Sequence, residues 1–325
     1  GEGNFKRMNQ PSFGSNKDIK GAAAAADFDK DGLIDLFVGG RIKPFNYGLP
    51  SGGFIYNNIG PGNFVDVTRQ IAPDLAEIGM ITDAIWIDID NDKDEDLVVA
   101  GEWMTLEIFE NDKGKLTRAT SKFGLTQYTG WWNRLLAVDV DKDGDMDVVA
   151  GNHGLNSRFK ASEQSPVVMY VNDFDQNGST EHIYGKQQGA EVIPYVLKHD
   201  LVSQLPNLKK KYLKYKDYND KKLSEIFSAE QLKSSRVLKA NYLASGVFVN
   251  EGGKFLFREL PVEAQLSPVF SLLSMDLNND GYEDLILGGN FFESRPQTGK
   301  YDASYGLVLL GSSTGDFTPL NALQS

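Results

Sequence analysis

The sequence predicts an all-β fold: a β-propeller of about five to seven four-stranded blades, forming one domain over residues 1–325. Three observations predict it. A nine-residue acidic motif occurs five times, β-rich runs that end in glycine follow it, and the copies are spaced as repeats of four strands would be. The copies are DFDKDGLID (27–35), DIDNDKDED (88–96), DVDKDGDMD (139–147), DFDQNGSTE (173–181) and DLNNDGYED (276–284).

The motif places carboxylates at every second residue. Positions 1, 3 and 5 are Asp or Asn in every copy, and position 9 is Asp or Glu. Position 2 is always apolar, and position 6 is Gly in every copy except the second, which has Lys93. Clustered like charges repel one another, so a bound cation must offset the repulsion if these segments are to fold.

Calcium fits this pattern, because Ca²⁺ takes about six to eight oxygen ligands in a flexible shell. The varied residues at position 7 suggest a ligand contributed by the backbone carbonyl, and glycine at position 6 permits a sharp turn. Mg²⁺ prefers stricter octahedral geometry. We predict about five structural Ca²⁺ ions. Their predicted ligand residues, loop by loop, are Asp27, Asp29, Asp31, Leu33 and Asp35; Asp88, Asp90, Asp92, Asp94 and Asp96; Asp139, Asp141, Asp143, Asp145 and Asp147; Asp173, Asp175, Asn177, Ser179 and Glu181; and Asp276, Asn278, Asp280, Tyr282 and Asp284.

The loops are not EF-hands. An EF-hand needs a glutamate at position 12 and flanking helices. Position 12 in these copies is Val38, Val99, Ala150, Tyr184 and Leu287. The flanking runs LFVGG, LVVAG and LILGG favour strands instead, so each loop is predicted to join two strands of a hairpin.

Composition limits the function classes. The five loops hold 22 of the 45 acidic residues and three lysines. The rest of the chain therefore has 23 acidic and 30 basic residues. The net charge of −12 is therefore local to the loops, and five Ca²⁺ ions would reduce it to about −2. The absence of cysteine excludes disulfides and thiolate metal sites. The start, GEGNFKRM, resembles the last strand of a unit, so we expect a trimmed piece of a longer protein.

The second unit illustrates the expected blade, with strands at 82–88, 96–100, 105–110 and 115–119. The small residues of GAAAAADF (21–28) suit an innermost strand, and GNFKRM (3–8) suits a closing strand. Residues 198–235 are predicted to be a helical insertion within a blade, with Ser228 and Gln231 forming a capping box. Its lysines suit a solvated helix face better than nucleic-acid binding.

The acidic loops resemble those of FG-GAP/VCBS-type propellers, the family that includes the integrin α-subunit head, although the literal FG-GAP tripeptides are absent. The chain is also similar to large bacterial VCBS proteins with an ASPIC/UnbV-type domain, which are related to cartilage acidic protein. The residues that carry this similarity are GMITDAIWIDID, VVAGEWM, GWWN, AGNHGLNSRFKAS, AQLSPVF and RPQTGKYDASYGLVLLG, spread over about 80–310. The chain departs from the family loop at Lys93, Asn177, Asn278 and Glu181.

This resemblance implies an exported binding or adhesion module. We therefore expect a calcium-stabilised extracellular or cell-surface scaffold for a protein or glycan partner, without catalytic activity, nucleic-acid binding or direct membrane insertion. Two alternatives remain open. One is a glycan-active lyase or hydrolase at the channel mouth, and the other is a subunit of an outer-membrane complex.

Blade geometry predicts where the partner binds. If the metal loops lie at one end of the blades, the connections between strands 2 and 3 and between successive blades gather at the other. The predicted partner-binding residues there are Arg41, Glu102, Trp103, Trp131, Trp132, Asn133, His153, Asn156, Arg158, Phe292, Glu293 and Arg295. His153 could act as a base if it met Glu102 and an arginine, but no Ser-His-Asp or three-His pattern is present, so no catalytic residue is predicted.

Overall fold

The structure is a computed structural model that describes residues 18–60, 62–294 and 298–320. Its strands form five sheets with four-stranded main paths, and every strand pairing within them is antiparallel. The all-β prediction is therefore confirmed at the level of fold class. The predicted closing strand at residues 3–8 lies outside the described residues. Among the described residues, no helix has the length and apolar character needed to cross a membrane.

Four sheets follow one another along the chain. Sheet 1 contains β1 (Ile19–Ala26), β2 (Asp35–Ile42), β3 (Gly53–Asn58) and β4 (Phe64–Asp66). Sheet 2 contains β5 (Met80–Ile87), β6 (Asp96–Met104), β7 (Glu107–Asp112) and β8 (Lys115–Arg118), and β9 (Gly130–Trp131) pairs with β6. Sheet 3 contains β10 (Arg134–Val138), β11 (Asp147–Gly151), β16 (Gly246–Asn250) and β17 (Phe255–Glu259). Sheet 4 contains β18 (Ser271–Met275), β19 (Asp284–Gly288), β20 (Leu307–Leu310) and β21 (Thr318–Pro319).

The fifth sheet is inserted between β11 and β16 of sheet 3. Its strand order is β14 (Glu191–Pro194), β13 (Glu181–Gln188), β12 (Val167–Asn172) and β15 (Arg236–Ala240). The helices after β14 are α2 (Lys198–Gln204), η2 (Pro206–Lys209), η3 (Tyr215–Asp217), α3 (Leu223–Ile226) and α4 (Ala229–Ser234). The short helices of the four-sheet body are α1 (Thr68–Ile71), η1 (Pro73–Glu77) and η4 (Val262–Gln265).

Apolar side chains hold sheets 1 to 4 face to face. In β6, Leu97 and Val99 pack toward sheet 1, whereas Val98 and Ala100 pack toward sheet 3. The same alternation in β11 directs Val149 toward sheet 4. Successive side chains of a strand point to opposite faces, so the runs LVVA and VVA are continuous because both faces of these strands are buried.

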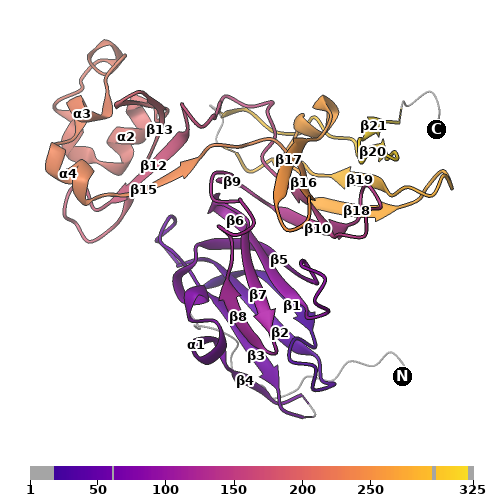
Figure 1. The fold of residues 1–325 in the computed structure, drawn as a ribbon. Helices are drawn as coiled ribbons and strands as arrows, with labels where there is room; N and C mark the ends of the chain where they lie inside the picture. The colour runs from indigo at the N-terminus through magenta and orange to yellow at the C-terminus, as the bar shows by residue number, and fades with distance from the viewer. Residues whose placement is uncertain (1–17, 61, 295–297, 321–325) are drawn as a thin grey trace, which may run out of the picture.

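The first strands of the four sheets, β1, β5, β10 and β18, contact one another in that order. Figure 1 shows sheets 1 and 2 together below, and sheets 3 and 4 together at the upper right. The described residues thus show four antiparallel sheets stacked in succession, and they do not show a closed ring.

The inserted unit has two layers (Figure 1). One face of its sheet, including Val168 and Ile183, packs against Leu201 and Phe227 of the helical segment. The other face packs against the ends of sheets 1 and 2 through Met169. The Ser228–Gln231 capping box is confirmed: the Gln231 N–H donates to Ser228 Oγ at 3.2 Å, and the Ser228 N–H donates to Gln231 Oε1 at 2.9 Å.

Candidate metal sites and ligand pocket

Each acidic loop joins two neighbouring antiparallel strands, so the hairpin prediction is confirmed. The backbone is left-handed at position 6 in all five loops. The φ angles are 90° at Gly32, 77° at Lys93, 95° at Gly144, 89° at Gly178 and 90° at Gly281. Position 4 is left-handed as well, with φ of 60° at Lys30, 63° at Asn91, 60° at Lys142, 60° at Gln176 and 58° at Asn279. The two left-handed residues turn the loop back on itself.

Backbone hydrogen bonds orient the first carboxylate of every loop. Oδ2 of position 1 accepts from the position-6 N–H at 2.9, 2.9, 3.1, 2.8 and 2.9 Å in loops one to five. The second oxygen is left without a protein partner in three of these loops: Oδ1 of Asp27, Asp88 and Asp139 is buried and accepts no hydrogen bond from the described residues. A buried carboxylate oxygen with no donor is expected where a cation binds.

Three acidic groups converge in each of the first four loops. The residues at positions 1, 3 and 9 offer oxygens that all lie within 4.8 Å of one another. The trios are Asp27, Asp29 and Asp35; Asp88, Asp90 and Asp96; Asp139, Asp141 and Asp147; and Asp173, Asp175 and Glu181. The fourth loop forms its trio even though it has the fewest carboxylates. In the fifth loop Asn278 takes the place of the middle carboxylate.

The position-9 carboxylates are buried inside the sheets. Asp96 is 1% exposed and accepts from the N–H groups of Ile89 (2.9 Å) and Asn111 (2.7 Å), which ties the loop to strand β7. Burial, reinforced by neighbouring carboxylates, raises the pKa of Asp96 to about 7 and those of Asp35 and Asp147 to about 6. A divalent cation in the loop would oppose this shift by favouring the ionised forms.

The remaining predicted ligand positions have distinct partners. The position-5 side-chain oxygen accepts from the position-7 N–H at 2.8 Å in all five loops. The position-7 side chains of Asp94 and Asp145 turn toward the neighbouring loop, where Lys30 and Asn91 bind them. The backbone carbonyl of position 7 is the ligand predicted at this position. An all-oxygen set of this kind fits Ca²⁺.

The loops of sheets 1 to 4 lie in a row. Position 4 of one loop contacts position 7 of the next: Lys30 pairs with Asp94, Asn91 Nδ2 donates to Asp145 Oδ1 at 2.6 Å, and Lys142 lies 5.3 Å from the Tyr282 ring centroid. The same register recurs at all three junctions, so the candidate metal sites are physically linked from sheet to sheet.

A cavity of about 440 Å³ lies where the connections after the second strands meet the inserted unit. Eight of the twelve predicted partner-binding residues line it: Arg41, Glu102, Trp103, Trp131, Asn133, His153, Arg158 and Glu293. The inserted unit contributes further lining residues that the sequence did not single out, namely His182, Tyr184, Tyr195, Asp200 and Gln204. The structure thus brings most of the predicted face into one concave site.

The other four predicted residues are not among the described residues that line the cavity. Trp132 is a correction: it is fully buried between sheets 2 and 3, and its Nε1 donates to Tyr128 O at 3.1 Å, so it cannot contact a partner. Asn156 is exposed and donates to Leu266 O at 3.1 Å outside the cavity. Phe292 is 57% exposed, while its neighbour Phe291 lines the cavity. Arg295 lies outside the described residues.

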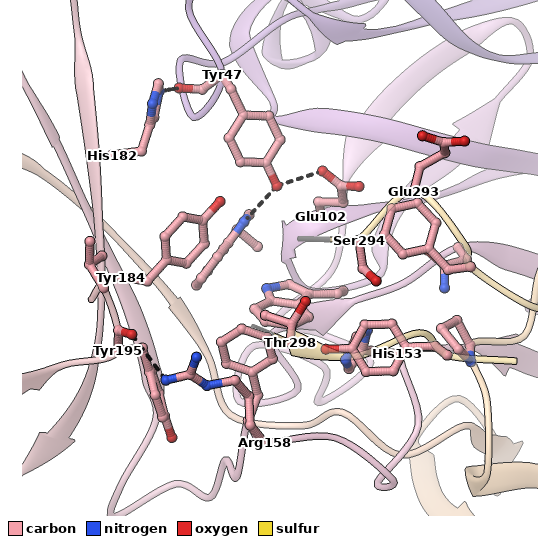
Figure 2. Close-up of a pocket in the computed structure, with 18 of the residues that line it drawn as sticks. Tyr47, Glu102, His153, Arg158, His182, Tyr184, Tyr195, Glu293, Ser294 and Thr298 are labelled. Atoms are coloured by element: carbon pink, nitrogen blue, oxygen red, sulfur yellow. Dashed lines mark hydrogen bonds between the residues drawn. The ribbon is translucent and has the colours of Figure 1, made fainter. Parts of the chain in front are cut away.

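A hydrogen-bond network fixes one side of the pocket (Figure 2). Glu102 is paired with Arg41 through one oxygen and accepts from the Tyr47 hydroxyl at 2.8 Å through the other. Trp103 Nε1 donates to the same hydroxyl at 3.0 Å, and His182 Nε2 lies 2.6 Å from Tyr47 O. Both oxygens of Glu102 are therefore already engaged, which orders this side before any ligand arrives.

Aromatic rings form the opposite side. Trp131 contacts Trp103, His153 and Phe159 with ring centroids 5.0, 5.0 and 5.1 Å apart. Phe159 also packs edge-on against Tyr195 at 5.2 Å. Edge-to-face contacts of this kind hold the rings in fixed orientations. The alternation of His182 and Tyr184 in β13 is the one sequence signal that could have identified the inserted part of this wall.

The surroundings of His153 make its imidazole a weak base. Its ring packs against Trp131, Phe159 and Tyr301, and burial lowers its pKa to about 4. The imidazole is therefore neutral at pH 7. His182 is also half-buried, and burial lowers its pKa too. His199 belongs to α2 and lies 3.4 Å from Asp200.

Comparison with known families finds the FG-GAP-like repeat at residues 88–150. This segment begins at the second acidic loop, crosses sheet 2 and ends in the second strand of the next hairpin. The match supports the FG-GAP/VCBS resemblance over that part of the chain. The curated proteins give no match to the chain.

Proposed function

We propose that this protein is a calcium-stabilised binding module of propeller type, and that its aromatic pocket captures a glycan. The observation that carries the proposal is the pocket itself, a cavity of about 440 Å³ walled by ordered aromatic rings. Its volume is in the range of small-ligand sites, and a concave site favours a glycan residue over a flat protein surface. Aromatic rings stack on the apolar faces of sugars, while the polar groups orient the hydroxyls.

The calcium part of the proposal rests on the five acidic loops. The partnerless Oδ1 atoms of Asp27, Asp88 and Asp139 give an ion its ligands, so binding energy would become folding energy. Extracellular calcium is abundant enough to fill modest sites, which supports an exported, cell-surface setting. The similarity to bacterial proteins with an ASPIC/UnbV-type domain, and membership of an outer-membrane complex, are finer proposals that agree with this setting.

Binding is favoured over catalysis at this site. A glycan hydrolase commonly uses two carboxylic groups, one of them able to give up a proton. Glu102 is tied to Arg41 and Tyr47, and His153 packs among aromatic rings with its pKa lowered to about 4. A lyase or hydrolase remains the second candidate, because Asp200 and Glu293 also line the pocket.

A glycan-binding experiment tests the proposal. Calcium-loaded protein is screened against immobilised glycans, and hits are measured in solution by calorimetry. Trp131→Ala should weaken binding by about tenfold or more, because it removes the central ring of the wall. Tyr305→Ala is the matched control, since Tyr305 is fully exposed and lies outside the pocket.

Two outcomes oppose the proposal. If no glycan binds the folded, calcium-loaded protein, a glycan module is wrong. If a bound glycan is cleaved, as seen by new chain ends in the mixture, the enzyme reading replaces the binding one.

A further inference from the structure

Three buried nitrogen atoms of pocket residues have no hydrogen-bond partner within the described ranges. They are Trp131 Nε1, Arg41 Nε and His153 Nε2. Protein interiors leave few buried polar atoms unpaired, so these three nitrogens call for a partner from a ligand or a bound water. The indole and guanidinium N–H groups can only donate. The pocket therefore calls for a ligand with hydrogen-bond acceptors.

Arg158 adds a positive charge to this wall. One of its guanidinium nitrogens donates to Tyr195 O at 3.0 Å, and the group lies 5.3 Å from the Tyr195 ring centroid. The arginine ion pairs found in the described part of the chain involve Arg41, Arg118, Arg134 and Arg258, and not Arg158. Among the described residues, its other N–H groups have no hydrogen-bond partner.

Trp131 and Arg158 belong to one continuous surface. Phe159 lies between them: its ring is 5.1 Å from that of Trp131 and 6.0 Å from the Arg158 guanidinium carbon. In Figure 2, Arg158 and Tyr195 lie across the pocket from Glu102. Three acidic residues also line the pocket: Glu102 is engaged by Arg41, Asp200 lies 3.4 Å from His199 Nε2, and Glu293 is exposed.

From these donors we infer that the glycan captured by the pocket is acidic, and that its carboxylate is bound by the Arg158 guanidinium and Trp131 Nε1 while its ring stacks on the aromatic wall. The ligand class is an oligosaccharide containing a uronic acid. This inference rests on the proposed glycan-binding function. Guanidinium groups bind carboxylates and sulfates through paired N–H donors, so a sulfated sugar is the competing source of the same chemistry.

Calorimetry on the calcium-loaded protein tests the inference with four probes. These are trigalacturonate, its methyl ester, a neutral galactose trimer and a sulfated galactose trimer. We expect trigalacturonate to bind about tenfold or more tightly than the ester and the neutral trimer, because a charge-assisted pair is lost in both. The sulfated trimer should bind more weakly than trigalacturonate.

Matched variants identify the residues. Arg158→Gln should reduce trigalacturonate affinity by about tenfold and leave affinity for the ester nearly unchanged. Trp131→Phe keeps an aromatic ring but removes the indole N–H, so it should lower the affinity for trigalacturonate severalfold. Arg236→Gln, an exposed position on strand β15 outside the pocket, should change nothing. Thermal melts with calcium verify that each variant is folded.

The outcomes separate the two levels of the argument. The acidic-ligand inference is overturned if the neutral trimer and trigalacturonate bind equally well. It is also overturned if the Arg158→Gln variant keeps the full preference for trigalacturonate over its methyl ester. Either result leaves the proposed glycan-binding function standing. Tighter binding of the sulfated trimer overturns the carboxylate assignment. Failure of every glycan on the screen overturns both the module and the inference.

Discussion

The sequence predicted the backbone conformation at some positions of the acidic motif and not at others. The pattern of Asp and Gly predicted the positive φ at position 6, including the strained Lys93. It missed the equally left-handed position 4, because Lys, Asn and Gln there give no residue-type signal as strong as glycine. Trp132 was misplaced for a similar reason: a GWWN sequence does not tell which tryptophan enters the core.

Replacing Lys93 by glycine should stabilise the protein. Lys93 has φ of 77°, a region that costs an L side chain about 1–2 kcal/mol and costs glycine nothing. Glycine loses more entropy on folding, so the expected net gain in unfolding free energy is about 0.5–1 kcal/mol in calcium-saturated protein. Chemical denaturation measures it. Lys115→Gly, in the exposed part of β8, is the control and should destabilise; a destabilised Lys93→Gly would contradict the strain argument.

Calcium-free protein should lose stability as the pH rises. Asp96 has a pKa raised from 3.8 to about 7 by burial, and those of Asp35 and Asp147 are raised to about 6. The folded state then keeps protons that the unfolded state has released, so the free energy of unfolding falls between about pH 4 and pH 7.

Bound calcium keeps these carboxylates ionised, so its stabilising effect should grow over the same window. Melting temperatures of dialysed metal-free protein, with and without added calcium, measure this at pH 5, 6, 7 and 8. If the melting temperature varies with pH in the same way with and without calcium, the prediction is contradicted.

At the scale of elements, hairpins were predictable because their signal is local. An apolar run, a turn motif and a second apolar run lie within about 20 residues, and the strands of sheet 2 appear within a few residues of the expected bounds. Contacts between hairpins were not predictable. The register that places Asn91 beside Asp145 depends on how two sheets stack, and residue type alone does not encode it.

This register makes a prediction about coupling between neighbouring loops. Asn91 Nδ2 donates to Asp145 Oδ1 at 2.6 Å across the junction of sheets 2 and 3. Asn91→Ala and Asp145→Ala should each lower the unfolding free energy, and the double variant should lose less than their sum. The expected coupling is about 0.5–1.5 kcal/mol, as for one typical hydrogen bond, because the pair is exposed to solvent. The pair Asn91→Ala and Asp316→Ala, which share no contact, should be additive.

At the scale of the whole molecule, the inserted unit was the main limit on prediction. Strand β11 ends at Gly151 and its partner β16 begins at Gly246, so sheet 3 is built from segments separated by a complete sheet and several helices. Two strands that are so far apart in the sequence leave no local sequence pattern that predicts their pairing. The helices of residues 198–234 were visible because of the spacing of their apolar residues and the Ser228–Gln231 capping box, whereas the enclosing sheet resembled another blade. The pocket depends on this insertion, which explains why only the body's half of its lining was expected.

Removal of calcium should destabilise the whole four-sheet body, because the loops are joined in a row and each is anchored in a buried position-9 carboxylate. A site contributes about 2.7 kcal/mol when free calcium is 100 times its dissociation constant. If the linked sheets unfold together these contributions add, so excess chelator should lower the melting temperature by many degrees in one cooperative transition. Metal analysis of the calcium-saturated protein should find about five ions per chain. Separate transitions would mean that the sheets unfold independently. An unchanged melt would show that the carboxylates tolerate one another without a cation, contrary to the electrostatic argument from which the fold and the exported setting were inferred.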